Sequence, residues 1–159
     1  MRIEIRGLHK SYQDADRKLE VICGLSISFV SGQSVAIVGR SGVGKSTLLH
    51  LLGGLDAPTA GSILYDDVEL GSLKGDALSD FRSANIGFVF QFHHLLPEFS
   101  ACENVAFPLI ISGWPEWKAA ARAREVLAWV GLGDRGDHRP GELSGGEQQR
   151  VAVARAIVG

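Results

Sequence analysis

The sequence predicts an α/β fold built around one glycine-rich loop. Residues 34–38 form an apolar run typical of a buried strand, and the residues from Gly39 to Gly44 are rich in glycine. The leucines of residues 46–52 then follow a helical pattern, and the glycines at 53 and 54 end it. This order of strand, tight loop and helix start is the local arrangement around which we expect the rest of the chain to pack.

Other segments of the chain also carry strand or helix patterns. Residues 3–6 and 25–30 alternate apolar and polar side chains, which predicts an antiparallel β-rich region before the loop. Residues 62–65 read as a short strand, 76–84 as a helix and 86–90 as a second buried strand. Residues 115–130 have the clearest helical period, on which we expect Trp117 and Trp129 to lie in the core.

The loop has the pattern G-x-x-x-x-G-K-S of a phosphate-binding P-loop, from Gly39 to Ser46. Its glycines allow backbone conformations that turn N–H groups toward phosphate oxygens, and the helix N-terminus adds unpaired donors. Lys45 would place a positive charge on the β- and γ-phosphates, and the Ser46 hydroxyl would bind Mg²⁺. The alternative is a glycine-rich turn that binds nothing, which the flanking strand and helix patterns disfavour.

Composition limits the remaining possibilities. The chain has 159 residues, 45% of them hydrophobic and 21% charged, with a net charge of −2. It therefore lacks the basic excess typical of nucleic-acid-binding domains. Cys23 and Cys102 have no metal-site spacing and are expected to be reduced thiols. Without a signal-peptide pattern or an apolar run that could span a bilayer, we expect a cytosolic protein that reaches a membrane only through partners.

Two single residues are candidates for nucleotide contacts. Tyr12 could stack on a nucleobase through its ring, although an isolated tyrosine is more often an ordinary core or surface residue. Gln91 follows the predicted strand 86–90, and ligands of open α/β sheets meet the ends of strands. Its amide could reach a metal ion or a water molecule.

The loop of residues 92–99 is unusually apolar. It is either a surface for another protein or a loop folded onto its own core, and the sequence leaves both alternatives open. His93 and His94 are adjacent but lack a third ligand at metal-site spacing, which makes a metal site there a weak hypothesis.

A second motif begins at Ser144. Ser144 and Glu147 form a capping box for a helix that runs toward Val158. Gly145 and Gly146 leave the first turn of this helix uncovered, although each glycine costs about 1 kcal/mol there relative to alanine. Helix capping alone gives no reason for two glycines in the first turn. A helix end that binds a second phosphate does, because it needs an uncovered backbone.

Taken together, these residues resemble the ATPase domain of ABC transporters. The resemblance implies an α/β P-loop NTPase of the ABC ATPase type, with ATP and Mg²⁺ as cofactors. Tyr12 would stack on adenine, and Ser46 and Gln91 would contact Mg²⁺. The signature residues would contact the γ-phosphate bound to a second copy, so that two copies close head to tail. The implied triphosphate contacts are Gly39, Arg40, Ser41, Gly42, Val43, Gly44, Lys45, Ser46 and Thr47; the implied signature contacts are Ser144, Gly145, Gly146, Glu147 and Gln148.

A finer resemblance lies in residues 91–105. This segment is similar to the ATPases of lipoprotein-releasing transporters, which are peripheral on the cytoplasmic face of the bacterial inner membrane. The resemblance implies contacts with two membrane permease subunits through residues 92–99. The alternatives are an ATPase of a related macrolide or peptide exporter, one of a cell-division complex, or a nucleotide-binding fragment without hydrolysis.

The chain departs from the family pattern at its C-terminal end. It ends at Gly159, before the apolar strand with Asp-Glu (Walker B), the D-loop and the switch histidine that the family pattern places next. Residues 1–159 would thus be the N-terminal part of one ABC ATPase domain, in which residues 86–150 hold the Gln91 loop, the helical subdomain and the signature. We expect part of the core sheet and the residues of hydrolysis to be missing, and the chain alone to be inactive.

Overall fold

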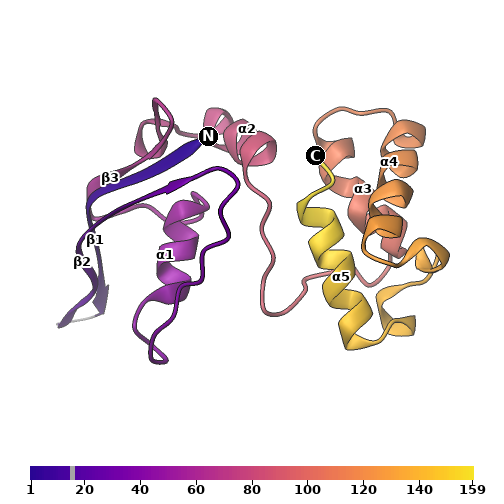
Figure 1. Ribbon diagram of the computed structural model, residues 1–159, viewed down its shortest axis with the longest axis horizontal. Helices are drawn as coiled ribbons and strands as arrows, with labels where there is room; N and C mark the ends of the chain where they lie inside the picture. Colours follow the sequence, from indigo (N-terminus) through magenta and orange to yellow (C-terminus); the bar gives the residue numbers. More distant parts are fainter. Residues whose placement is uncertain (15–16) are drawn as a thin grey trace. The chain divides into compact units, whose positions relative to one another are not determined.

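The computed structural model describes residues 1–14 and 17–159, which form two compact units, Met1–Asp80 and Phe81–Gly159. Each unit has its own architecture (Figure 1). The first holds the strands and the P-loop, and the second is helical.

The first unit is built on a four-stranded antiparallel sheet in the order β2-β1-β3-β4. The strands are β1 (Arg2–Asp14), β2 (Arg17–Val30), β3 (Ala60–Tyr65) and β4 (Val68–Glu69), followed by a 3-10 turn at Leu70–Ser72. Ile5 of β1 lies opposite Ile27 of β2 and Ile63 of β3, and both Ile5 and Ile63 are buried. The predicted antiparallel β-rich region and the short strand at 62–65 are therefore confirmed.

Helix α1 (Lys45–Leu52) starts directly after the P-loop and ends at Gly53, as the sequence predicts. It lies beside the sheet (Figure 1), and the Tyr65 hydroxyl on β3 donates a hydrogen bond to the Leu52 carbonyl at 2.8 Å. Helix α2 (Asp76–Asn85) follows and carries the chain into the second unit. The helix predicted at 76–84 is thus also confirmed.

The two strands predicted on apolar runs are wrong. Residues 34–38 and 86–90 belong to no strand in the structure. Val35 and Val38 are 54% and 86% exposed, so residues 34–38 are not buried either. An apolar run becomes a strand only where a second backbone pairs with it, and the sheet that the described residues form includes neither segment.

The second unit is a bundle of α3 (Ala101–Ile111), α4 (Glu116–Trp129) and α5 (Gly145–Ala156), with 3-10 turns at Gly133–Arg135 and Pro140–Glu142. Figure 1 shows the three helices side by side. Val105, Leu127 and Val151, one from each helix, are fully buried in a common core. The helix predicted at 115–130 and the signature helix are both confirmed.

Two features of this unit differ from expectation. Helix α3 was not predicted, although Ser100 and Glu103 form the same capping box as Ser144 and Glu147. Trp117 and Trp129 are 75% and 59% exposed, so their predicted place in the core is wrong. The buried face of α4 is instead made of two alanines, which let the helices approach closely, and two larger aliphatic residues: Ala119, Ala123, Val126 and Leu127.

One buried polar residue ties the loop before α3 to the helix. Asn104 is 1% exposed, and its side chain makes four hydrogen bonds to that loop. The Leu96 amide donates to its Oδ1, and its Nδ2 donates to the carbonyls of Leu96, Phe99 and Ser100, at 2.8–3.1 Å. Removing the amide would break all four of these bonds, although the carbonyls of Leu96 and Ser100 would each keep one bond from a backbone amide.

We therefore expect Asn104→Ala to lower the free energy of unfolding of this unit by at least about 1–3 kcal/mol, the cost of a buried polar group left unsatisfied. Denaturation followed by tryptophan fluorescence measures this unit, because Trp114, Trp117 and Trp129 all lie in it. Asn85→Ala is the control, since Asn85 is exposed and its side chain donates to the Phe81 carbonyl of the preceding helical turn. Equal stability of the two variants would contradict this role of Asn104.

Candidate functional site

The P-loop is curled around the side chain of Lys45. The Lys45 ammonium donates hydrogen bonds to the carbonyls of Gly39 at 2.9 Å and Arg40 at 2.7 Å. These bonds hold its charge within the loop. An ammonium has three donors, so one remains for a ligand after the two loop carbonyls are satisfied.

Glycine is required at the end of the loop. Gly44 is the N-cap of α1 and has φ of 98°, a left-handed conformation that other residues rarely adopt. A Cβ atom at this position would lie 2.8 Å from Cγ1 of Val21 on β2 and 3.2 Å from its carbonyl oxygen. Gly44 thus allows the loop to turn sharply into the helix while it packs directly against the sheet.

The N-terminus of α1 is free of competing anions. Gly44 provides no side-chain cap, and the first turn of α1 has no acidic residue. By contrast, α3 and α5 carry Glu103 and Glu147 in their first turns. The backbone donors and positive dipole end of α1 are therefore not neutralised by its own residues, and the exposed Ser46 hydroxyl lies beside them. This environment suits a phosphate group with a bound cation.

Tyr12 lies next to the start of the same helix. Tyr12 as a whole residue is 40% exposed, and its hydroxyl donates to Oδ2 of Asp56 at 2.7 Å. This hydrogen bond, together with burial, raises the pKa of Tyr12, while interaction with the Thr47 side chain acts in the opposite direction. Thr47 of the P-loop helix is therefore one of the side chains near the Tyr12 hydroxyl.

Asp56 is held as a carboxylate. Burial opposes its ionisation, but hydrogen bonds from Lys10, Tyr12 and the Ala57 amide outweigh burial and lower the pKa of Asp56. Lys10 and Asp56 form an ion pair at 2.7 Å, and Lys10 is only 8% exposed. Sequence reasoning missed both residues.

Gln91 lies in the second unit, in an exposed position, whereas Ser46 lies in the first. The end of α5 contacts the backbone both before and after Gln91. The Arg155 guanidinium donates to the carbonyls of His93 and His94, both at 2.8 Å. Before Gln91, the backbone of Gly87 is so close to the Ala156 carbonyl that a Cβ atom would collide with it. Arg155 is a further residue that the sequence did not reveal.

The loop of residues 92–99 fits both of its predicted alternatives in part. Leu95 packs against the helical core, and the ring of Phe99 contacts the ring of Phe107 at 5.3 Å between centroids. Phe92 is 74% exposed and Leu96 38% exposed. The loop is therefore anchored on its own core while it presents Phe92 to the outside.

The signature segment caps α5 as predicted. The Ser144 amide and hydroxyl donate to Glu147 at 2.8 Å and 2.7 Å. These bonds, with a smaller effect of Arg135, lower the pKa of Glu147. Gly145 and Gly146 are exposed, and an added Cβ would meet no close neighbour at Gly145.

Gln148 has a structural partner. Its amide donates to the carbonyls of Pro140 at 2.9 Å and Leu143 at 3.1 Å, so it holds the segment before the helix. Within the signature, the exposed backbone of Gly145 and Gly146 is thus better placed for an outside ligand than the side chains of Glu147 and Gln148.

Metal and pocket geometry add two observations. In the chain outside residues 15 and 16, no group of three or more His, Cys, Asp or Glu side chains could hold a metal ion, so His93 and His94 form no such group.

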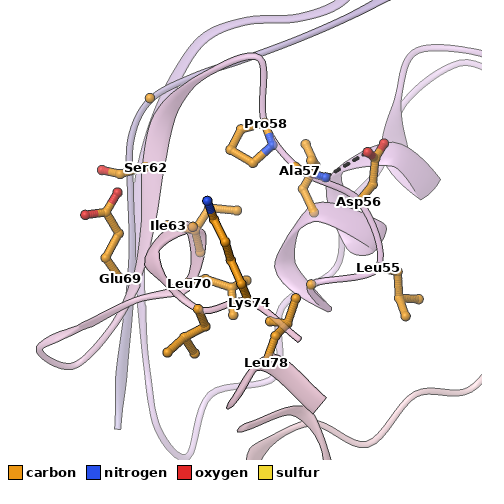
Figure 2. Close-up of a pocket in the computed structure, with 15 residues that line it drawn as sticks. Leu55, Asp56, Ala57, Pro58, Ser62, Ile63, Glu69, Leu70, Lys74 and Leu78 are labelled. Carbon is orange, nitrogen blue, oxygen red and sulfur yellow. Dashed lines mark hydrogen bonds between the residues drawn. The ribbon is translucent and has the colours of Figure 1, made fainter. Parts of the chain in front are cut away.

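A cavity of about 330 Å³ lies between the end of α1, β3 and residues 69–78, and Figure 2 shows Ile63, Leu70 and Lys74 in its lining. None of its lining residues belongs to the P-loop. The residues predicted to bind phosphate are on the exposed loop rather than in this cavity.

No helix in residues 1–14 and 17–159 is long and apolar enough to cross a membrane.

Comparison with known proteins agrees with this site. Residues 22–159 match the family described as ABC transporter. The chain is 54% identical to the lipoprotein-releasing system ATP-binding protein LolD of Syntrophotalea carbinolica, over 99% of this chain and 69% of that protein. It is 53% identical to the protein of the same name from Geobacter metallireducens, over 98% of this chain and 69% of that protein.

Solved structures give the same result. The ATP-binding cassette MJ0796, in a dimeric post-hydrolysis state bound to ADP and Pi, superposes with a TM-score of 0.90 at 36% identity. A second dimeric structure of MJ0796 also has a TM-score of 0.90, at 37% identity. Both matches cover 98% of this chain and 69% of the solved chain. With its P-loop and signature helix in place and a family match over most of its length, the chain belongs to the ABC transporter ATPase family.

Proposed function

We propose that this chain belongs to the ATP-binding subunit of an ABC transporter that releases lipoproteins from the bacterial inner membrane. The observation that carries the proposal is the P-loop, in which Lys45 is held at the uncompensated N-terminus of α1. The names of the relatives at more than 50% identity supply the lipoprotein-releasing role.

In this proposal the first unit binds the nucleotide. The backbone of residues 39–47 and the Lys45 ammonium hold the triphosphate, and Tyr12 stacks on the base. Ser46 would bind Mg²⁺, to which a hydroxyl oxygen is a suitable ligand. In the second unit, the amide oxygen of Gln91 is a further candidate Mg²⁺ contact. The ion would neutralise charge on the phosphates.

Lys45→Ala removes the charge-assisted contact to phosphate, which is worth about 1.5–3 kcal/mol. We therefore expect the affinity for MgATP, measured by calorimetry, to fall on the order of tenfold to a hundredfold. Lys74→Ala is the matched control, because Lys74 is an exposed lysine of the same unit outside the P-loop. Unchanged affinity in Lys45→Ala would rule out phosphate binding by the loop.

The second proposed element is a head-to-tail dimer. The dimeric state of MJ0796 supports an assembly of two cassettes. In such an assembly, Ser144, Gly145 and Gly146 would contact the γ-phosphate of a nucleotide bound to the partner copy. The exposed backbone at the start of α5 supports this role.

The matching capping boxes of α3 and α5 separate this role from simple helix capping. Ser144→Ala and Ser100→Ala each remove an N-cap and should destabilise the unit equally, by about 1 kcal/mol. In a protein that contains a whole ATPase domain, we expect only Ser144→Ala to lower the rate of ATP hydrolysis, on the order of tenfold or more. Binding of ATP to the monomer should be retained in both variants.

Steady-state hydrolysis and monomer binding, measured side by side, test this prediction. If both variants hydrolyse ATP at the same rate, Ser144 acts only as a helix cap. If Ser144→Ala loses binding in the monomer, the contact is made within one copy.

The third proposed element is the contact with the membrane. We place the protein as a peripheral subunit on the cytoplasmic face of the inner membrane, bound to two permease subunits through residues 92–99. Phe92 is the most exposed apolar residue of this loop and follows Gln91 directly. A permease that binds Phe92 would therefore be next to the proposed Mg²⁺ contact.

Phe92→Ser should reduce co-purification of the permease subunits and leave MgATP affinity unchanged, because it removes apolar contact area without altering the core. Ile111→Ser is the matched control, since Ile111 is also 74% exposed but lies at the end of α3. Wild-type recovery of the permeases with Phe92→Ser, in a quantitative pull-down, would reject this interface.

A further inference from the structure

The side chains of Tyr12, Lys10 and Asp56 form a polar network. Asp56 accepts hydrogen bonds from the Tyr12 hydroxyl and from the Lys10 ammonium, both at 2.7 Å. Lys10 also donates to the Ala57 carbonyl at 2.8 Å. The Ala57 amide donates to Oδ1 of Asp56 at 2.7 Å, and Figure 2 draws this bond as a dashed line. The network fixes the position of the Tyr12 hydroxyl near the end of β1.

Lys10 also occupies one face of the ring. Lys10 and Tyr12 are two positions apart on β1, which directs both side chains to the same side of the strand. The Lys10 ammonium lies 4.6 Å from the centroid of the Tyr12 ring, within the range of a cation–π contact. Because Lys10 is buried and paired, it blocks this face, and the exposed area of the ring must belong to the other side.

Asp56 connects this network to the P-loop helix. It follows α1 closely, and the amides of Leu55 and Asp56 both bond to the His50 carbonyl in the last turn of that helix, at 2.9 Å and 3.4 Å. The N-terminus of the same helix carries Lys45 and Ser46. One helix therefore fixes both the phosphate-binding loop and the residue that anchors the tyrosine.

We propose that Asp56 is a positioning residue for nucleotide binding, which holds Tyr12 so that the face opposite Lys10 receives the base of a nucleotide whose phosphates lie in the P-loop. The inference rests on the proposed binding of ATP. Asp56 does not touch the nucleotide in this arrangement. It reduces the freedom of the ring before binding, so that less entropy is lost when the base stacks.

The test compares MgATP with magnesium tripolyphosphate, which has the phosphates but no base. Tyr12→Phe keeps the ring and removes only the hydroxyl that bonds to Asp56. Asp56→Asn keeps the shape and removes the charge that holds Lys10. We expect each variant to bind MgATP about threefold to tenfold more weakly in calorimetry, a part of the effect of losing a stacked base. Binding of tripolyphosphate should be unchanged.

A double mutant tests whether Asp56 affects MgATP affinity only by positioning the Tyr12 ring. Tyr12→Ala removes the stacking surface, and Asp56→Asn in that background should have no further effect on MgATP affinity. Asp67→Ala is the control for a carboxylate of the same unit, because Asp67 is exposed in the turn between β3 and β4.

Three results would overturn the proposal: unchanged MgATP affinity in Tyr12→Phe and Asp56→Asn, equal weakening for tripolyphosphate, or an undiminished effect of Asp56→Asn in the Tyr12→Ala background. Failure of the ATP-binding proposal itself has a different signature. In that case neither MgATP nor tripolyphosphate binds the wild-type protein, or Lys45→Ala binds both as well as wild type does.

Discussion

The left-handed turn at Gly44 is the constraint on which the site depends. At this residue the P-loop turns into α1 and packs against Val21 of β2 with no room for a side chain. The turn leaves the N-terminus of α1 without a cap and directs Lys45 back to the carbonyls of Gly39 and Arg40. A charged ammonium, backbone donors and a helix dipole are thereby gathered at one exposed place. These are the properties that a triphosphate requires, and the sheet supplies the rigid support for them.

The helical unit uses a different principle, in which polar side chains fix loops to a tightly packed core. Asn104 holds the segment before α3 with four hydrogen bonds, and Arg155 holds the carbonyls next to Gln91. Helix α5 carries Ser144 at its start and Arg155 near its end. The Gln91 loop and the signature are therefore attached to the same helix, and a displacement of one is expected to affect the other.

Local patterns predicted the parts of the structure that local physics determines. The P-loop, α1, α4 and α5 follow from glycine positions, helical periodicity and a capping box, each contained in a few residues. The strands predicted at 34–38 and 86–90 were wrong because a strand depends on a backbone partner that the run itself does not contain. Helix α3 was missed because it is apolar on most of its surface and lacks the polar face that reveals a helical period. Asp56 and Arg155 could not be predicted, since their partners lie 44 to 62 positions away in the sequence.

The central claim is that the backbone of the P-loop binds the phosphates of a nucleotide. Amide chemical shifts recorded by NMR during titration with MgATP test it most directly, because each loop amide reports on its own hydrogen bond. We expect saturable shifts that are largest from Gly39 to Thr47, with the same loop responding to magnesium tripolyphosphate. Saturable binding of MgATP that leaves these amides unmoved would contradict it.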